Sequence, residues 1–129
     1  MNRFINYAHR GASDYAPENT MSAFRKAIEL KANGIELDLQ KTKDGKIVIF
    51  HDDFIDKKSN GIGTISDYTY NELLKFDFGS WFDLKYKDEK IVLFEEFAKK
   101  FLSEDLTFAI ELKTIGCLLY TSPSPRDCS

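Results

Sequence analysis

Apolar residues gather in four short runs along the chain, each bounded by polar residues or turns. The runs are Phe4–Ala8, Gly34–Gln40, Lys46–His51 and Leu106–Lys113. All are short and rich in Ile, Leu, Val or Phe, which is typical of buried β-strands. The pattern therefore predicts four strands.

Residues 19–31 carry the period of an amphipathic helix. Their apolar side chains fall on one side, at Met21, Phe24, Ala27 and Ile28. Asn19 or Thr20 can cap the start of this helix, and Asn33-Gly34 offers a left-handed stop. We expect a helix here, between the first two strands, as parallel strands require.

Two more helical patterns follow. The segment T-Y-N-E-L-L holds a capping box, with Thr69 at the N-cap and Glu72 three residues later. A stripe of apolar residues then recurs at helical spacing, at Leu93, Phe94, Phe97, Ala98, Phe101 and Leu102. Such a stripe favours a helix face packed on the core over a cofactor contact.

Strands that alternate with helices indicate an α/β architecture with parallel pairing. The connection K-T-K-D-G between the second and third strands is too short for a helical crossover, and Asp44-Gly45 is typical of a hairpin turn. Either the third strand pairs antiparallel with the second, or the chain crosses over without a helix. The residues leave both alternatives open.

Composition and charge narrow the class of protein. A chain of 129 residues suits one small domain, and 43% hydrophobic with 30% charged residues is typical of a soluble globular protein. The net charge of -3 and the lack of a basic stripe argue against nucleic acid as a partner. No apolar run approaches the roughly 20 residues that span a bilayer. The N-terminus has no secretory h-region, so we expect a cytoplasmic protein without a transmembrane segment.

Both cysteines, Cys117 and Cys128, lie close to the C-terminus. Their spacing matches no metal-binding motif, and two cysteines of this kind predict no disulfide framework.

Carboxylates alternate with apolar residues in two of the predicted strands. Glu36 and Asp38 share one face of the second strand, and Glu111 takes a similar place in the last one. Carboxylates this close repel, and burying them unpaired is costly, so they should share a cation or a proton. Three oxygen ligands with no Cys or His between them suit Mg²⁺ or Ca²⁺ better than zinc. The alternative is a solvated acidic face, and spacing does not decide between the two.

Both histidines of the chain stand at strand ends, His9 after the first run and His51 after the third. A single histidine in such a place is more often structural, but the coincidence favours a shared role as general acid and base. Beside His9, Arg10 offers a planar fork for phosphate oxygens, and Gly11 allows close approach of a ligand. Carboxylates, imidazoles and this arginine together suggest hydrolysis of a phosphate ester.

Six segments between Tyr7 and Lys113 resemble, in their order and spacing, the glycerophosphodiester phosphodiesterase family. They read A-H-R-G-A-S-D-Y-A-P-E-N-T, G-I-E-L-D-L-Q-K-T-K-D-G, I-V-I-F-H-D-D, S-N-G-I-G-T-I-S-D, F-G-S-W-F and A-I-E-L-K. The resemblance implies a TIM-barrel (β/α)₈ fold, of which this chain holds the first half, with about four strands. Its site would lie at the carboxyl ends of the strands. The resemblance also implies that the second and third strands are parallel and joined by a short link without a helix.

By the same resemblance, the reaction is cleavage of a glycerophosphodiester into glycerol 3-phosphate and an alcohol, assisted by Mg²⁺ or Ca²⁺. The implied roles are acid and base for His9 and His51, substrate binding for Arg10, Lys113 and Glu18, and metal binding for Glu36, Asp38 and Glu111. Neither the order of the two histidines nor the nucleophile, water or a glycerol hydroxyl, is implied.

The end of the chain departs from the family pattern. A barrel of this type needs about 250 residues, so residues 1–115 are interpreted as its N-terminal half. Residues 116–129 resemble a translated sequencing adapter, with a natural disordered tail as the alternative. A half barrel should expose strand edges and self-associate, and we expect little or no activity from it.

Two other functions compete with this interpretation. One is a phospholipase D-like lipid headgroup enzyme of the same superfamily, a branch that usually carries cysteine bridges and a leader. The other is a non-catalytic half barrel that binds a ligand or a partner, in which His9 and His51 would be dispensable.

Overall fold

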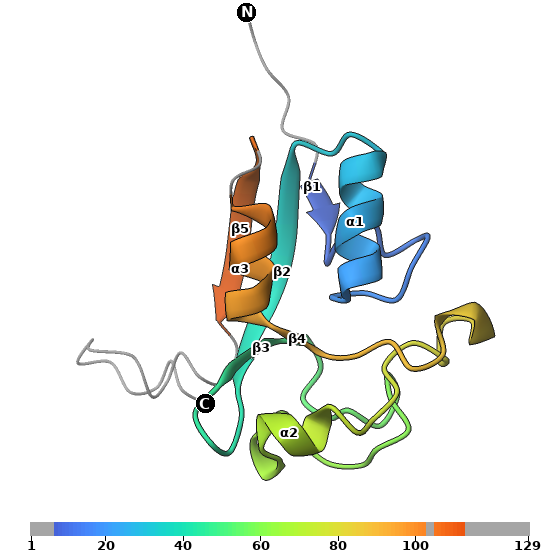
Figure 1. Ribbon diagram of the computed structural model, residues 1–129, viewed down its shortest axis with the longest axis vertical. Helices are drawn as coiled ribbons and strands as arrows, with labels where there is room; N and C mark the ends of the chain where they lie inside the picture. The colour runs from blue at the N-terminus through green and yellow to red at the C-terminus, as the bar shows by residue number, and fades with distance from the viewer. Residues whose placement is uncertain (1–6, 103–104, 113–129) are drawn as a thin grey trace, which may run out of the picture.

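A mixed five-stranded sheet organises the chain, with helices packed against it (Figure 1). The computed structural model describes residues 7–102 and 105–112. In chain order the elements are β1 Tyr7–His9, α1 Met21–Glu29, β2 Gly34–Lys41, β3 Ile47–Ile49, the 3₁₀ helix η1 Ile65–Asp67, α2 Tyr70–Leu73, the 3₁₀ helix η2 Leu84–Tyr86, β4 Val92–Leu93, α3 Phe94–Phe101 and β5 Thr107–Leu112. The four predicted strand regions overlap β1, β2, β3 and β5, with β1 and β2 each ending one residue later than predicted, and the short β4 is additional. Residues 4–6 of the first predicted strand lie outside the described residues.

Strand β2 is the centre of the sheet. It pairs in parallel with β1 and with β5. The register places His9 opposite Glu36, and Asp38 opposite Glu111. Because parallel neighbours in register share a face, this pairing brings polar side chains from three strands to one side of the sheet.

The connection after β2 is a tight hairpin. β3 runs antiparallel to β2, with Leu39 opposite Ile49, and β4 runs antiparallel to β3. Gly45 has a φ of +84°, and the amide of Thr42 donates to the carbonyl of Lys46 across the turn. The hairpin alternative is confirmed, and the parallel arrangement implied by the family resemblance is wrong here, since so few residues cannot form a crossover connection.

The main hydrophobic core lies between β2 and the two longer helices. Ile35, Leu37 and Leu39 of β2 are buried together with Phe24 of α1 and Phe97 of α3. The ring of Phe97 lies edge-on to that of Phe24, at 4.7 Å between centroids. The alternation of β2 therefore turns its apolar face to the helices and its polar face, with Glu36 and Asp38, to the other side of the sheet.

The predicted apolar stripe from Leu93 to Leu102 is confirmed in its central part. Phe97 and Phe101 are buried, whereas Leu93 belongs to β4 and Leu102 caps the helix with 57% of its surface exposed. The predicted stripe is one residue longer than the helix at each end, because α3 spans only Phe94–Phe101.

The capping signals in the sequence predicted where α1 and α2 begin but not where α1 ends. The Thr20 hydroxyl accepts from the amide of Ala23, so Thr20 is the N-cap of α1. Thr69 and Glu72 form the expected capping box of α2. The predicted stop of α1 at Asn33-Gly34 is wrong, because α1 ends at Glu29 and Lys31 takes the left-handed conformation, at φ +65°.

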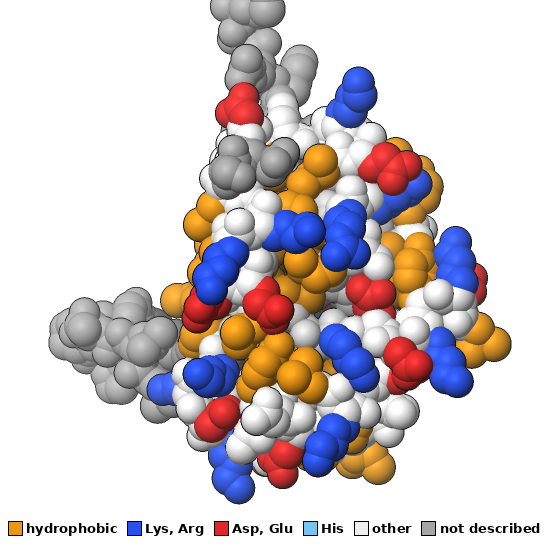
Figure 2. All heavy atoms as spheres, viewed as in Figure 1, with side chains coloured by type: hydrophobic (Ala, Val, Ile, Leu, Met, Phe, Trp, Pro, Cys, Tyr) orange, Lys and Arg blue, Asp and Glu red, His pale blue; other side chains and the backbone are white. Residues whose placement is uncertain are grey.

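A second core supports the long segment between β3 and β4. It holds Val48, Phe50, Ile55, Ile65, Leu73, Phe78 and Ile91. On the face shown in Figure 2, acidic, basic and hydrophobic side chains are interspersed. Within the two described ranges, no helix combines the length and the apolar character needed to cross a membrane.

Candidate active site

Three carboxylates from two parallel strands meet on the polar face of the sheet. Carboxylate oxygens of Glu36, Asp38 and Glu111 all lie within 4.8 Å of one another. The register explains this convergence, because Asp38 and Glu111 are direct partners and Glu36 is two residues before Asp38 on the same face. Residues 73 positions apart in sequence thus form one cluster.

The three carboxylates differ in burial according to their strands. Asp38 on central β2 is fully buried and Glu36 is half-buried, whereas Glu111 on β5 is exposed. His9 on β1 is also open, with 61% of its side chain exposed. Both open residues belong to strands that have β2 as their only partner among the described residues, so one flank of each faces solvent.

Four buried side-chain polar atoms of the described residues lack a hydrogen-bond partner, and all four belong to this site. They are Oε1 of Glu36, Oδ1 of Asp38, Oδ1 of Asn19 and Nε of Arg10. Buried polar groups in native proteins are nearly always paired, so such a concentration requires an explanation. Three of the atoms are oxygens, the ligand type that Mg²⁺ and Ca²⁺ prefer. The residues present therefore fit a hard divalent cation.

The electrostatics of Glu36 agree with this fit. Burial raises the pKa of Glu36 above its ordinary value of 4.5, and the neighbouring Asp38 raises it further, while His9 and Arg10 oppose the shift. Removing a carboxylate from water and placing it beside another both disfavour the charged form. A bound cation would relieve both effects.

This shift predicts a pH dependence of stability in the absence of divalent metal. Because the folded pKa of Glu36 is raised, folded protein binds more protons, and stability falls as pH rises from 4.5 through that pKa. In EDTA, Glu36→Gln should reduce this fall and make the chain more stable at neutral pH. Urea unfolding across the range measures the effect, with Glu95→Gln on an exposed face of α3 as control. Equal pH profiles for the parent chain and Glu36→Gln would contradict it.

Arg10 is held beside the cluster in an unusual backbone conformation. Its φ is +56°, and that of Asn19 is +57°, while the amide of Asn19 donates to the Arg10 carbonyl. Left-handed conformations are uncommon for residues other than glycine and often mark functional sites. Gly11 follows at φ +79°, and a Cβ there would lie 2.8 Å from atoms of Ala23. The turn after β1 is thus pressed against α1.

This turn directs the Arg10 guanidinium toward two carboxylates. Nη1 donates to Glu18 at 3.3 Å, and Nε lies 3.4 Å from Oδ2 of Asp38. Asn19 Nδ2 donates to the same Asp38 oxygen at 3.2 Å. The contacts fix the buried Asp38 and leave its other oxygen, Oδ1, without a partner.

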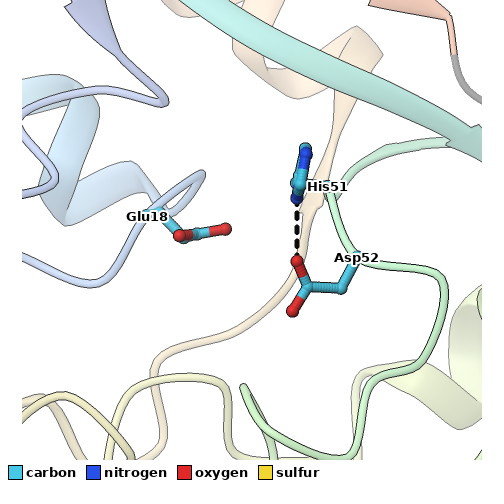
Figure 3. Close-up of side chains that lie close together, drawn as sticks. All are labelled: Glu18, His51 and Asp52. Carbon is cyan, nitrogen blue, oxygen red and sulfur yellow. Dashed lines mark hydrogen bonds and ion pairs between the residues drawn. The ribbon is translucent and has the colours of Figure 1, made fainter.

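His51 stands two residues after the end of β3, and Figure 3 shows the carboxylates of Glu18 and Asp52 near its ring. Its Nδ1 is 2.8 Å from Oδ1 of Asp52. A carboxylate on Nδ1 holds the proton there and leaves Nε2 to accept or deliver a proton. Glu18 faces this pair, and one ligand atom from each of Glu18, His51 and Asp52 lies within 4.8 Å of the others.

Gln40 fixes the backbone that carries His51. Its Nε2 donates to the carbonyls of Phe50 and Asp52, at 3.0 and 2.7 Å. Gln40 follows Glu36 and Asp38 on the same face of β2, so this face supplies both the acidic cluster and the support for His51.

His9 stands on the other side of the cluster, with Nε2 3.7 Å from Oε1 of Glu36. The structure therefore brings Glu36, Asp38, Glu111, His9 and Arg10 together, and links Glu18 and His51 to them through Arg10. Lys113, Cys117, Cys128 and the predicted tail 116–129 lie outside the described residues.

Sequence reasoning missed several residues that build this site. Asn19 contacts Asp38, Asp52 orients His51, and Lys58 pairs with Glu18 at 3.5 Å. The alternation of apolar and polar residues that predicted a shared face for Glu36 and Asp38 also places Gln40 on that face. Nothing in the local sequence marks Lys58, because its contact with Glu18 spans 40 residues.

A mixed sheet with helices on one face, and with three carboxylates and His9 on the other face, defines an α/β protein with a candidate active site. The family model described as the Glycerophosphoryl diester phosphodiesterase family matches residues 9–116. The chain belongs to this family.

Curated relatives and solved structures agree with this assignment. A glycerophosphodiester phosphodiesterase of Caldanaerobacter subterraneus subsp. tengcongensis is 44% identical over 113 residues, which cover 88% of this chain and 46% of the relative. Glycerophosphodiester phosphodiesterase 1 of Homo sapiens is 36% identical, with 86% of this chain and 34% of the relative covered. The chain thus spans less than half the length of these relatives.

Among solved structures, an Oleispira antarctica phosphodiesterase in complex with the product sn-glycerol-3-phosphate is 34% identical, with a TM-score of 0.79. The match covers 83% of this chain and 43% of the Oleispira protein. A glycerophosphodiester phosphodiesterase from Agrobacterium tumefaciens gives a TM-score of 0.78 at 33% identity, with 82% of this chain and 46% of that protein matched. These neighbours belong to a TIM-barrel fold family.

Proposed function

We propose that the protein to which this chain belongs hydrolyses glycerophosphodiesters to glycerol 3-phosphate and an alcohol, with a divalent cation. One observation carries the proposal, namely that four buried polar atoms without a hydrogen-bond partner gather at a cluster of three carboxylates. Family membership supports the substrate class, and the solved relative with sn-glycerol-3-phosphate bears the corresponding product.

Glu36, Asp38 and Glu111 would hold the cation, Mg²⁺ or Ca²⁺. When bound, such an ion stabilises negative charge that builds on phosphoryl oxygens. Asp38 is the best prepared ligand, because Arg10 and Asn19 fix one of its oxygens and leave the other free.

Arg10 would bind the substrate phosphate. Its guanidinium carries several donors in a rigid plane, and Nε remains without a hydrogen-bond acceptor. The left-handed turn and the contact with Glu18 hold the plane in one orientation before the substrate arrives. Preorganised charge of this kind stabilises a transition state without the cost of reorganisation. Lys113 would add positive charge on the side of β5.

His9 and His51 would exchange protons with the substrate. One imidazole takes the proton of the attacking hydroxyl, from water or from the neighbouring glycerol hydroxyl, as its oxygen bonds to phosphorus. The other donates a proton to the alcohol oxygen as the bond between phosphorus and that oxygen breaks. With water as nucleophile this gives glycerol 3-phosphate directly. With the glycerol hydroxyl as nucleophile it gives a cyclic phosphate, and a water must then attack phosphorus and break one ring P–O bond to yield glycerol 3-phosphate, with the same imidazoles moving the protons. Asp52 holds His51 with Nε2 available for either step.

We further propose that this domain, residues 1–115, is the first half of a barrel. The coverage of 46% and 43% in two relatives supports this extent. β1 and β5 are the strands with unpaired flanks among the described residues, where further strands would continue a barrel. The chain alone should accordingly show little turnover.

A hybrid protein tests the function directly. Residues 1–112 of this chain would replace the matching part of the Caldanaerobacter relative, which supplies the remainder. We expect hydrolysis of glycerophosphoglycerol or glycerophosphocholine with Mg²⁺ or Ca²⁺, loss of turnover in EDTA, and recovery on adding the metal back. The intact relative is the control for assay and folding. A folded hybrid that turns over neither substrate, or that is indifferent to EDTA, would refute the proposal.

A further inference from the structure

Lys58 lies between the candidate site and the face of an aromatic ring. Its Nζ is 3.5 Å from Oε1 of Glu18 and 4.2 Å from the centroid of the Trp81 ring. Glu18 in turn faces His51 and contacts Arg10. The Lys58 ammonium group therefore lies over the indole ring and also contacts Glu18, which faces the candidate catalytic residue His51.

The ring of Trp81 is held in place by its own loop. Its indole Nε1–H donates to the carbonyl of Phe78 at 2.9 Å. Burial acts to raise the pKa of Asp77, but the hydrogen bonds that it accepts from the Ser80 hydroxyl and from the amides of Gly79 and Ser80 lower it to about 2. Trp81 is therefore a fixed surface, with 37% of the residue still exposed to a ligand.

A small hollow joins this ring to the candidate site. Its lining residues come from the turn before α1, from the end of β3 and the segment that follows it, and from the loop that carries Trp81; those used here are Glu18, Phe50, Lys58 and Trp81. Lys58 is half-buried in this lining, whereas the adjacent Lys57 is exposed. The contacts with Glu18 and Trp81 hold Lys58 in the lining of this hollow.

Aromatic faces attract cations, and a tryptophan face attracts them most strongly. Here that face is already occupied by Lys58, and the charge of Glu18 is shared between Lys58 and Arg10. A ligand with a fixed positive charge would meet an ammonium group instead of the ring. Like charges in a partly buried site repel strongly, because water screens them poorly.

We propose that Lys58 is a specificity-determining residue that excludes quaternary ammonium groups from the Trp81 face and so favours substrates whose alcohol carries no fixed positive charge. This inference rests on the proposed function for its substrate class. The exclusion itself is a binding property and requires no turnover.

The test uses the 129-residue chain and its single tryptophan, which gives one indole N–H signal in a proton–nitrogen NMR spectrum. Tetramethylammonium chloride is the probe, and sodium chloride corrects for ionic strength. In the parent chain, the indole signal should respond equally to both salts. In Lys58→Met, which is unbranched like lysine but one atom shorter and uncharged, it should show a saturable shift specific to tetramethylammonium, with affinity at least about tenfold higher.

Two further variants separate charge from shape. Lys58→Arg keeps a cation over the ring and should exclude the probe like the parent chain. Lys85→Met removes another lysine that lies over an aromatic ring, 5.3 Å from the centroid of Tyr86, and should leave the indole response unchanged. Circular dichroism establishes that each variant is folded, and the same substitutions in the hybrid protein provide a second measurement.

Each outcome decides the inference. Saturable tetramethylammonium binding by the parent chain overturns it, as does its absence in folded Lys58→Met, or equal binding by Lys58→Arg and Lys58→Met. A hybrid without hydrolytic activity would refute the proposed function but leave the binding result intact. In an active hybrid, Lys58→Met should raise kcat/KM for glycerophosphocholine relative to glycerophosphoglycerol by about tenfold.

Discussion

Replacing His51 by alanine in the hybrid protein is expected to lower kcat/KM for glycerophosphodiesters about 10²- to 10⁴-fold, the range typical of general acid–base groups. The imidazole is held by Asp52 through Nδ1 and lies near Glu18, and an imidazole is the side chain best suited to move a proton near neutral pH. Steady-state kinetics at saturating divalent metal measure the effect.

Two neighbours of His51 provide graded controls for this loss. Asp52→Asn keeps the imidazole but weakens the contact at Nδ1, and should cost about 10- to 100-fold by analogy with other oriented histidines. Asp53→Asn changes an exposed carboxylate one residue further on and should have little effect. If His51→Ala retains the turnover of Asp53→Asn, His51 has no catalytic role and the proposed mechanism fails.

Divalent metal is expected to stabilise the chain, and Asp38→Asn is expected to abolish that stabilisation. An ion that binds only the folded state adds about 2.7 kcal/mol to the free energy of unfolding when its concentration is a hundred times its Kd. Asp38 is the fully buried member of the cluster, and its Oδ1 has no other partner. Urea unfolding in Mg²⁺ or Ca²⁺ and in EDTA, followed by Trp81 fluorescence, measures the increment.

The metal-dependent increment is the decisive quantity, because Asp38→Asn also removes the partner of Arg10 and should destabilise the chain in EDTA. Glu95→Gln, at an exposed position of α3, should keep the full increment. An increment of equal size in Asp38→Asn would show that the metal binds elsewhere. Its absence from the parent chain at saturating metal would show that these carboxylates hold no cation.

The candidate site combines rigid and strained parts. Glu36 is fixed by strand pairing with both β1 and β5, and Asp38 by pairing with β5 and by the hydrogen bond that its carbonyl accepts from the amide of Phe50. The Arg10 and Asn19 turn, in contrast, holds two residues in left-handed conformations, which costs of order 1–3 kcal/mol for each such residue. Asn19 tolerates this conformation better than Arg10, since asparagine is enriched there. The contacts of Arg10 with Glu18 and Asp38 offset the conformational cost of its left-handed backbone.

Local sequence signals predicted much of the fold. Alternation in β2 separated Ile35 and Leu37, which are buried in the core, from Glu36 and Asp38 on the opposite face. Periodicity located α1 and α3, and Thr69 marked the start of α2. These features are readable because they depend on side chains within one or two turns or pleats.

The direction of β3 shows where resemblance and local chemistry disagreed. The family pattern implied a parallel third strand, whereas Asp44-Gly45 indicated a hairpin, and the antiparallel pairing of Leu39 with Ile49 decides for the hairpin. The end of α1 at Glu29 was not predicted, because the left-handed residue beyond it is Lys31, and a lysine carries no sequence signal for that conformation.

By itself, then, the sequence determined four of the five strands, the starts of α1 and α2, the polar face of β2 and the candidate chemistry of two histidines, an arginine and three acids. Only the tertiary structure decided that Glu111 lies in register with Asp38, that Gln40 supports the backbone of His51, and that Lys58 reaches Glu18 and Trp81. The physical reason is range: periodicity and capping act between near neighbours, whereas register and long-range ion pairs depend on how β2, its flanking strands and the loops pack together.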